Sequence, residues 1–199
     1  MICLALTGGI ACGKSELGRL LGLAGAETVD ADVVVGRLHG PGGQAAEIVA
    51  AEFGREYLLP GGATDKARLS RLVFSDAGAR RRLEGALHPI VRKWLLDWKN
   101  RPGDPSSVRV AQIPLLFESS WSGDWDFTAT VETSSAESRM ARLAARGLSR
   151  AEAEARIRSQ LSSSERAAKA DFVIWNDSGK EQLGKLAELL LLSLKNQRT

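Results

Sequence analysis

Residues 8–15 read GGIACGKS, which is the G-x-x-x-x-G-K-S pattern of a phosphate-binding loop. Gly8 and Gly13 permit backbone angles that a side chain would hinder, so successive N–H groups can turn toward phosphate oxygens. Lys14 has the position that reaches the β- and γ-phosphates of a nucleotide, and the Ser15 hydroxyl is placed to ligate Mg²⁺. The pattern therefore predicts a nucleoside-triphosphate site rather than an ordinary glycine-rich turn.

The segments around this loop fit the motif and predict an α/β fold. Residues 2–6 are an apolar run typical of a buried strand, and residues 16–21 predict a helix whose N-terminus adds positive charge. Further strands are expected at 27–32, 127–131 and 172–175, and residues 108–117 are expected to form the third strand and its exit. Their alternation with helical patterns is typical of a parallel sheet with helices on both faces.

Only helical patterns lie between the second and third strands. In this segment, residues 33–100, the pair His88 and Pro89 is expected to separate two helices, with Pro89 at a first helical position. His88 then either caps the second of these helices or points into a substrate cleft. We therefore expect a five-stranded parallel sheet with a helical insertion.

Two acids, Asp30 and Asp32, come where the second strand should end. In an open α/β sheet, ligands bind beyond the carboxyl ends of the strands. Asp32 could take the proton from an attacking hydroxyl, or only orient it, because a loose phosphoryl transition state depends mainly on positioning. The alternative is that Asp32 caps the following helix while Asp30 is solvated. Spacing alone leaves both interpretations open.

Arginines recur three or four residues apart after the fourth strand, at Arg139, Arg142, Arg146 and Arg150. The first three share one face of a helix that is expected to begin at Ser134 and end at Gly147. Such a hairpin of short helices suits a lid over nucleotide phosphates, in which Arg146 would stabilise transition-state charge. A solvated basic face is the alternative.

The composition limits other functions. The net charge is only +3, which gives little support for nucleic-acid binding. Cys3 is expected in the buried strand and Cys12 in the loop, so a reducing cytosol fits better than a disulfide. Cys12 is more simply a small filler than a stabilised thiolate. The N-terminus lacks the basic region of a signal peptide, and no apolar run is long enough to span a bilayer. The histidines, His39 and His88, are too far apart to support a zinc site.

The motifs that would indicate other phosphate-loop proteins are missing. There is no N-K-x-D, which GTPases use to read the base, and no LSGGQ of transporter ATPases. An insertion for the acceptor and a lid for the donor suit a small-molecule or nucleotide kinase, because closing both would exclude water. Two alternatives remain: a kinase for a nucleoside or small alcohol, and an ATP-dependent module that binds nucleic acid through the arginine hairpin.

A set of motifs spread over nearly the whole chain resembles the dephospho-coenzyme A kinase family. They are LTGGI at 6–10, GKS at 13–15, DAD at 30–32, LHP at 87–89, PLLFE at 114–118, RGLS at 146–149, and ADFVI with Asn176 at 170–176. The resemblance implies that ATP, with Mg²⁺, phosphorylates the 3′-hydroxyl of dephospho-coenzyme A in the cytoplasm, the last step of coenzyme A biosynthesis. It implies neither a nucleic acid nor a membrane as partner, and a monomer is slightly favoured.

The resemblance also implies a division of the chain into three parts with assigned residues. These are a nucleotide-binding core (1–32, 101–138 and 171–199), a coenzyme-binding insertion (33–100) and a lid (139–170). Asp32, Lys14 and Arg146 are the implied catalytic residues, and Asn176 is placed near the adenine. The implied ATP site comprises Gly8, Gly9, Ile10, Ala11, Cys12, Gly13, Lys14, Ser15, Glu16, Arg142, Arg146 and Asn176, and the implied acceptor site comprises Thr7, Asp32, His88 and Leu116.

The loop departs from the family pattern at three positions. Ala11 and Cys12 stand where the family usually has Gly and Ser, and Glu16 stands where it usually has Thr or Ser. Because residues 13–15 are intact, we expect an altered nucleotide affinity rather than lost activity. Ala11 would be strained if its position required a positive φ.

Overall fold

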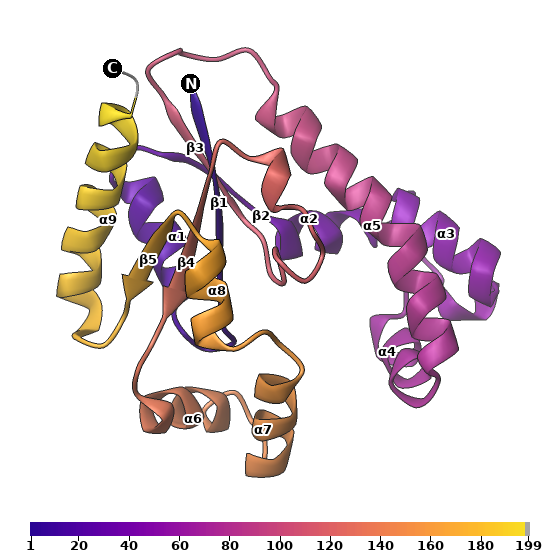
Figure 1. Ribbon diagram of the computed structural model, residues 1–199. Coiled ribbons are helices and arrows are strands. Elements are labelled where there is room, and N and C mark those ends of the chain that lie inside the picture. Colours follow the sequence, from indigo (N-terminus) through magenta and orange to yellow (C-terminus); the bar gives the residue numbers. More distant parts are fainter. Residues whose placement is uncertain (198–199) are drawn as a thin grey trace. The chain divides into compact units, whose positions relative to one another are not determined.

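The computed structural model describes residues 1–197 (Figure 1). The chain divides into two compact units: an α/β unit, made of Met1–Asp30 and the chain from Pro102 onward, and a helical unit, Ala31–Arg101. The nucleotide-binding core expected from the sequence extends to residue 199, and its last two residues lie outside the described part.

Five parallel strands form the sheet of the α/β unit, in the order β2-β3-β1-β4-β5. Their bounds are Ile2–Gly8 for β1, Glu27–Asp30 for β2, Val108–Gln112 for β3, Phe127–Glu132 for β4 and Phe172–Trp175 for β5. The central strand β1 pairs with β3 on one side and with β4 on the other. Because it is covered on both faces, it needs the continuous apolar run of residues 2–6. The predicted five-stranded parallel sheet is confirmed.

The second strand is shorter than the sequence predicts. It ends at Asp30, and Asp32 lies instead in the first turn of the next helix. The third strand ends at Gln112, and the chain after it turns through Leu115 and Ser120, which both have positive φ.

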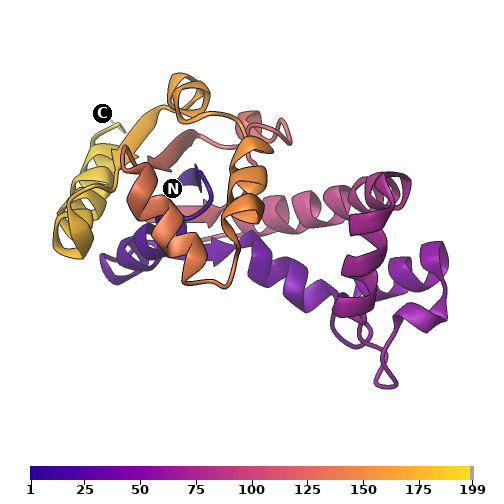
Figure 2. The ribbon, with the colours of Figure 1, turned by 90° about the horizontal axis from the view of Figure 1, so that it is seen from below.

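Helices α1 (Lys14–Leu23) and α9 (Gly179–Asn196) pack against each other and against the sheet, while α8 (Ser163–Lys169) lies against β4. The core that they share with the strands includes Leu4, Leu6, Leu17, Leu21, Val110, Leu190 and Leu194. The carboxyl ends of β4 and β5 point toward α6 (Ala136–Ala144) and α7 (Arg150–Arg158) in Figure 1, and Figure 2 views the structure from that side. A short helix, η2 (Ser122–Asp124), precedes β4.

Helix α6 does not begin at Ser134 as expected. The N–H and hydroxyl of Ser134 donate to the Asp177 carboxylate instead, each at 2.9 Å. Ser135 is the N-cap, and its hydroxyl accepts the N–H of Ser138. The sequence could not distinguish the two neighbouring serines, because the competing carboxylate comes from the far end of the chain.

The helical unit consists of four α-helices and a short η1 within the described residues. They are α2 (Ala31–Leu38), α3 (Gln44–Phe53), η1 (Arg55–Tyr57), α4 (Lys66–Ser75) and α5 (Ala77–Lys99). The expected break at Pro89 is wrong, since α5 runs through it. Proline removes the hydrogen bond to the carbonyl four residues earlier. Here that residue is Gly85, which is exposed, so water can solvate its carbonyl.

Among the helices of residues 1–197, none combines the length and the apolar character needed to cross a membrane.

Candidate functional site

The backbone of residues 8–13 is shaped by close approaches and by positive φ angles. A Cβ at Gly8 would lie 2.6 Å from the carbonyl oxygen of Val131 on the neighbouring strand, so a side chain has no room there. Gly13 begins α1 with a φ of 113°. Ala11 has a φ of 62°, so the position does require the left-handed conformation, which costs a non-glycine residue about 1–2 kcal/mol.

Three side chains hold the carbonyl groups of the loop from outside. Each donates one hydrogen bond, from Arg139 to Ile10 at 2.9 Å, from Arg142 to Ala11 at 3.0 Å and from Asn176 to Cys12 at 2.8 Å. In a planar trans peptide the N–H points opposite to the C=O. The N–H groups of Ala11 and Gly13 are therefore turned away from these side chains, as an anion-binding loop requires.

The ammonium group of Lys14 is buried and lies 3.7 Å from an Asp30 carboxylate oxygen. It makes no hydrogen bond to any residue in the described chain. A buried cation without a hydrogen-bond acceptor is unfavourable, so this nitrogen fits an anionic ligand. Asp30, for which one interpretation of the sequence was a solvated side chain, is thus an ion-pair partner of the loop lysine.

A cavity of about 370 Å³ opens beside Lys14. Its described lining comprises Ala11, Gly13, Lys14, Ser15, Glu16, Arg142, Arg146, Asn176, Gly179, Lys180 and Leu183. The four cationic side chains in this set outnumber its single carboxylate, that of Glu16. A larger hollow of about 510 Å³ lies on α6 and α7, but its lining is mainly apolar and includes Met140 and Leu148. The smaller cavity is therefore the candidate nucleotide site.

Glu16 contributes its negative charge to the edge of this cavity. Arg19 binds both carboxylate oxygens, at 2.8 and 3.2 Å, and this hydrogen bonding lowers the pKa of Glu16. The carboxylate therefore stays ionised, and Arg19 partly neutralises it.

Cys12 is completely buried within the core beneath the loop. Burial raises the pKa of its thiol, although the Arg139 charge opposes this effect. The thiol is therefore protonated at neutral pH, which favours a small space-filling side chain over a stabilised thiolate.

The cavity brings together most of the ATP-site residues that the sequence implied, whereas Gly8, Gly9, Ile10 and Cys12 form the loop behind it. Asp32 and His88 belong to the helical unit, where His88 is exposed within α5. His88 therefore does not cap a helix. Thr7 and Leu116 are buried in the α/β unit.

Sequence reasoning missed Lys180, which borders the cavity. It follows β5 and so lies where the strand-end rule could have found it.

No group of three or more His, Cys, Asp or Glu side chains suited to a metal occurs in residues 1–197. Mg²⁺ in phosphate-transfer sites keeps several waters and takes few protein oxygens. The Ser15 hydroxyl at the cavity and the nearby Asp30 carboxylate are oxygen donors of the kind that it accepts.

The parallel sheet, the loop and the buried lysine define the class of P-loop kinases. The structure of shikimate kinase from Acinetobacter baumannii in complex with shikimate matches with a TM-score of 0.58 over 100% of this chain and 96% of that one; at 17% identity it shows the fold alone.

A family model described as dephospho-CoA kinase matches residues 2–182, and the chain belongs to this family. A dephospho-CoA kinase from Symbiobacterium thermophilum is 42% identical over 180 residues, which is 88% of this chain and 74% of that protein. The structure of TT1252 from Thermus thermophilus has 35% identity and a TM-score of 0.78, and the match covers 97% of each chain.

Proposed function

We propose that this chain transfers the γ-phosphate of ATP to the 3′-hydroxyl of the ribose of dephospho-coenzyme A. The family match over residues 2–182 supports the reaction. The single structural observation that carries it is the buried Lys14 ammonium, which borders a cationic cavity and has no hydrogen-bond acceptor in the described chain.

In this proposal the α/β unit binds the donor. Lys14 and the loop N–H groups hold the β- and γ-phosphates, and Arg142 and Arg146 offset the charge that develops during transfer. Asn176, whose amide holds the Cys12 carbonyl and which lines the cavity, would lie near the adenine. Residues 139–170 would act as the lid.

Mg²⁺ would be held by the Ser15 hydroxyl and by the nucleotide itself, and the Asp30 carboxylate, which pairs with Lys14, is an acceptor for a water bound to the ion. When bound, this ion supplies charge neutralisation on the phosphate oxygens. The chain's own contribution is to place Ser15 in the first turn of α1, one residue after Lys14.

The acceptor would bind through the helical unit. Asp32, two residues after β2 ends, would accept or orient the hydroxyl proton, and His88 would contact the coenzyme. Thr7 and Leu116, which the resemblance also assigns to the acceptor, are buried in the α/β unit. A cytoplasmic location and a monomeric state remain predictions, and gel filtration tests the second.

The test is a coupled ADP-release assay with ATP, Mg²⁺ and a panel of acceptors: dephospho-coenzyme A, nucleosides and small alcohols. We expect turnover with dephospho-coenzyme A and a kcat at least ~10²-fold lower for Asp32→Asn. The matched control is Asp65→Asn, an acid that caps α4 in the same unit and should leave kcat unchanged. Preferential turnover of another acceptor would contradict the reaction, and an unaffected Asp32→Asn enzyme would remove Asp32 from it.

A further inference from the structure

Glu132 and Arg166 form a completely buried ion pair at the carboxyl end of β4. The Arg166 Nε and Nη2 donate to the two carboxylate oxygens at 2.6 and 2.7 Å. Both residues are at most 2% exposed. Arg166 comes from α8, so the pair joins this helix to the strand beside the loop.

The remaining polar atoms of the pair are also satisfied. The hydroxyls of Thr130 and Ser163 donate to the Glu132 carboxylate, and the Arg166 Nη1 donates to the carbonyl of Leu161. Burial opposes ionisation of Glu132, but hydrogen bonds from Arg166, Ser163 and Thr130 outweigh it and lower the pKa of this carboxyl. The guanidinium therefore has one fixed orientation.

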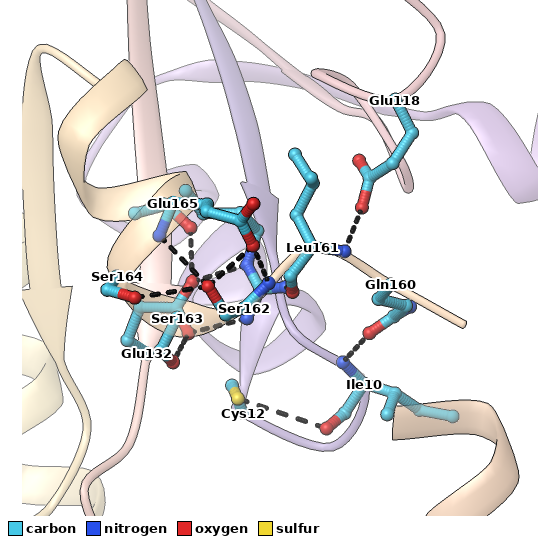
Figure 3. Close-up of polar contacts among 12 residues, drawn as sticks. Ile10, Cys12, Glu118, Glu132, Gln160, Leu161, Ser162, Ser163, Ser164 and Glu165 are labelled. Atoms are coloured by element: carbon cyan, nitrogen blue, oxygen red, sulfur yellow. Dashed lines mark hydrogen bonds and ion pairs between the residues drawn. The ribbon is translucent and has the colours of Figure 1, made fainter. Parts of the chain in front are cut away.

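This fixed guanidinium lies against the first turn of the phosphate loop. A Cβ at Gly9 would be 2.5 Å from the Arg166 Nη2 and 2.9 Å from the Arg139 Nη2. The segment that leads into α8 contacts Ile10, the residue after Gly9, because the Gln160 side chain accepts the N–H of Ile10 at 2.8 Å (Figure 3).

The segment that carries these groups is itself anchored. Figure 3 shows the Leu161 N–H directed at the Glu118 carboxylate, with a distance of 3.0 Å. Glu118 ends the PLLFE motif, so a separate part of the chain holds the segment that contacts residues 9 and 10.

A buried ion pair is weak evidence for a stabilising role, because desolvation offsets most of its attraction. We propose that Arg166, held by Glu132, is a positioning residue that sets the Gly9–Ile10 turn of the phosphate loop and thereby the affinity for the nucleotide. Gln160 assists it through the Ile10 N–H. This inference rests on the proposed function only in naming ATP as the ligand.

The test compares Arg166→Lys with a matched control, Arg109→Lys. Arg109 is also a buried arginine that pairs with a glutamate, Glu27, at 2.7 Å, but it lies near the amino ends of β2 and β3. ATP binding is measured by titration calorimetry with Mg²⁺, and Tm by scanning calorimetry. We expect both variants to lower Tm, but only Arg166→Lys to raise the ATP Kd, by ~10- to 100-fold.

Two further variants keep the inference testable if Arg166→Lys does not fold. Gln160→Ala removes one hydrogen bond from a half-buried side chain and should raise the ATP Kd by about fivefold with little change in Tm. Gly9→Ala should weaken ATP binding more in the native chain than in an Arg166→Lys background, because lysine lacks the Nη2 that the new methyl group would meet.

Equal ATP Kd values for the Arg166→Lys and Arg109→Lys proteins would overturn the inference. So would an unchanged Kd for Gln160→Ala, or equal effects of Gly9→Ala in the two backgrounds. The native protein separates the two hypotheses: if it binds ATP but does not phosphorylate dephospho-coenzyme A, the proposed function fails and the positioning role still stands.

Discussion

Replacing Asn176 tests how the phosphate loop is held. Its amide nitrogen donates to the Cys12 carbonyl at 2.8 Å, and the side chain is 8% exposed. Asn176→Ala leaves that buried carbonyl without its partner, which costs about 1–3 kcal/mol. Asn176→Asp additionally places a carboxylate oxygen against the carbonyl oxygen, so it should be the less stable of the two. For a protein of this size, 1 kcal/mol corresponds to a Tm shift of about 2–4 °C.

A second substitution makes this prediction sharper. A Cβ at Gly13 would collide with the Asn176 amide nitrogen, and the φ of 113° adds strain. Gly13→Ala should therefore destabilise the native protein more than it destabilises the Asn176→Ala protein. In the Asn176→Ala background the collision is removed and only the backbone strain at residue 13, about 1–2 kcal/mol, remains. Urea unfolding of the native protein, Asn176→Ala, Asn176→Asp, Gly13→Ala and the Gly13→Ala/Asn176→Ala double variant measures both effects. Additive free energies, or an Asn176→Asp protein as stable as Asn176→Ala, would refute this account of the loop.

Three other predictions follow from buried groups. Burial, together with the Lys66 charge, lowers the pKa of His39, so the unfolded chain binds a proton more readily than the folded chain. The stability that neutral His39 contributes is therefore fully present above a pH of about 6.5 and is lost as the pH falls below it. A His39→Asn protein should show a weaker pH dependence of its urea midpoint. Ala11→Gly should change the free energy of unfolding by less than about 1 kcal/mol. Glycine relieves the left-handed strain, but it adds chain entropy to the unfolded state and removes the packing contact of the Ala11 methyl group. A decrease of more than about 2 kcal/mol in the free energy of unfolding would contradict the assigned φ. Cys12 should react with iodoacetamide only after unfolding, as mass spectrometry can show, and rapid labelling of the native protein would contradict its burial.

Features that depend on neighbouring residues could be predicted from the sequence. The loop at residues 8–15, the apolar strand before it and the order of strands and helices all follow from local patterns. The prediction at Pro89 is wrong for a related reason. The helix α5 continues through this proline because the Gly85 carbonyl, which loses its hydrogen bond, is exposed to water. Whether that carbonyl is exposed depends on packing, which the local pattern does not contain.

Contacts between distant residues could not be predicted in this way. Arg166 pairs with Glu132, which lies 34 positions away in the sequence, and the Gln160 side chain accepts the N–H of Ile10, which lies 150 positions away. Neither residue belongs to a recognisable local motif, so their place beside the loop emerges only from the folded chain. The pairing of Lys14 with Asp30 is similar, because sequence spacing drew attention equally to Asp30 and Asp32.

Arg142 has two tasks, since it binds the Ala11 carbonyl and also borders the cavity. A phosphate that attracts this guanidinium would compete with the backbone for the same donors. Occupancy of the cavity would then change how firmly helix α6 is attached to the loop, without any change in the sheet. Arg142, which binds the Ala11 carbonyl, is thus also the residue through which a bound nucleotide would act on the hairpin that α6 and α7 form.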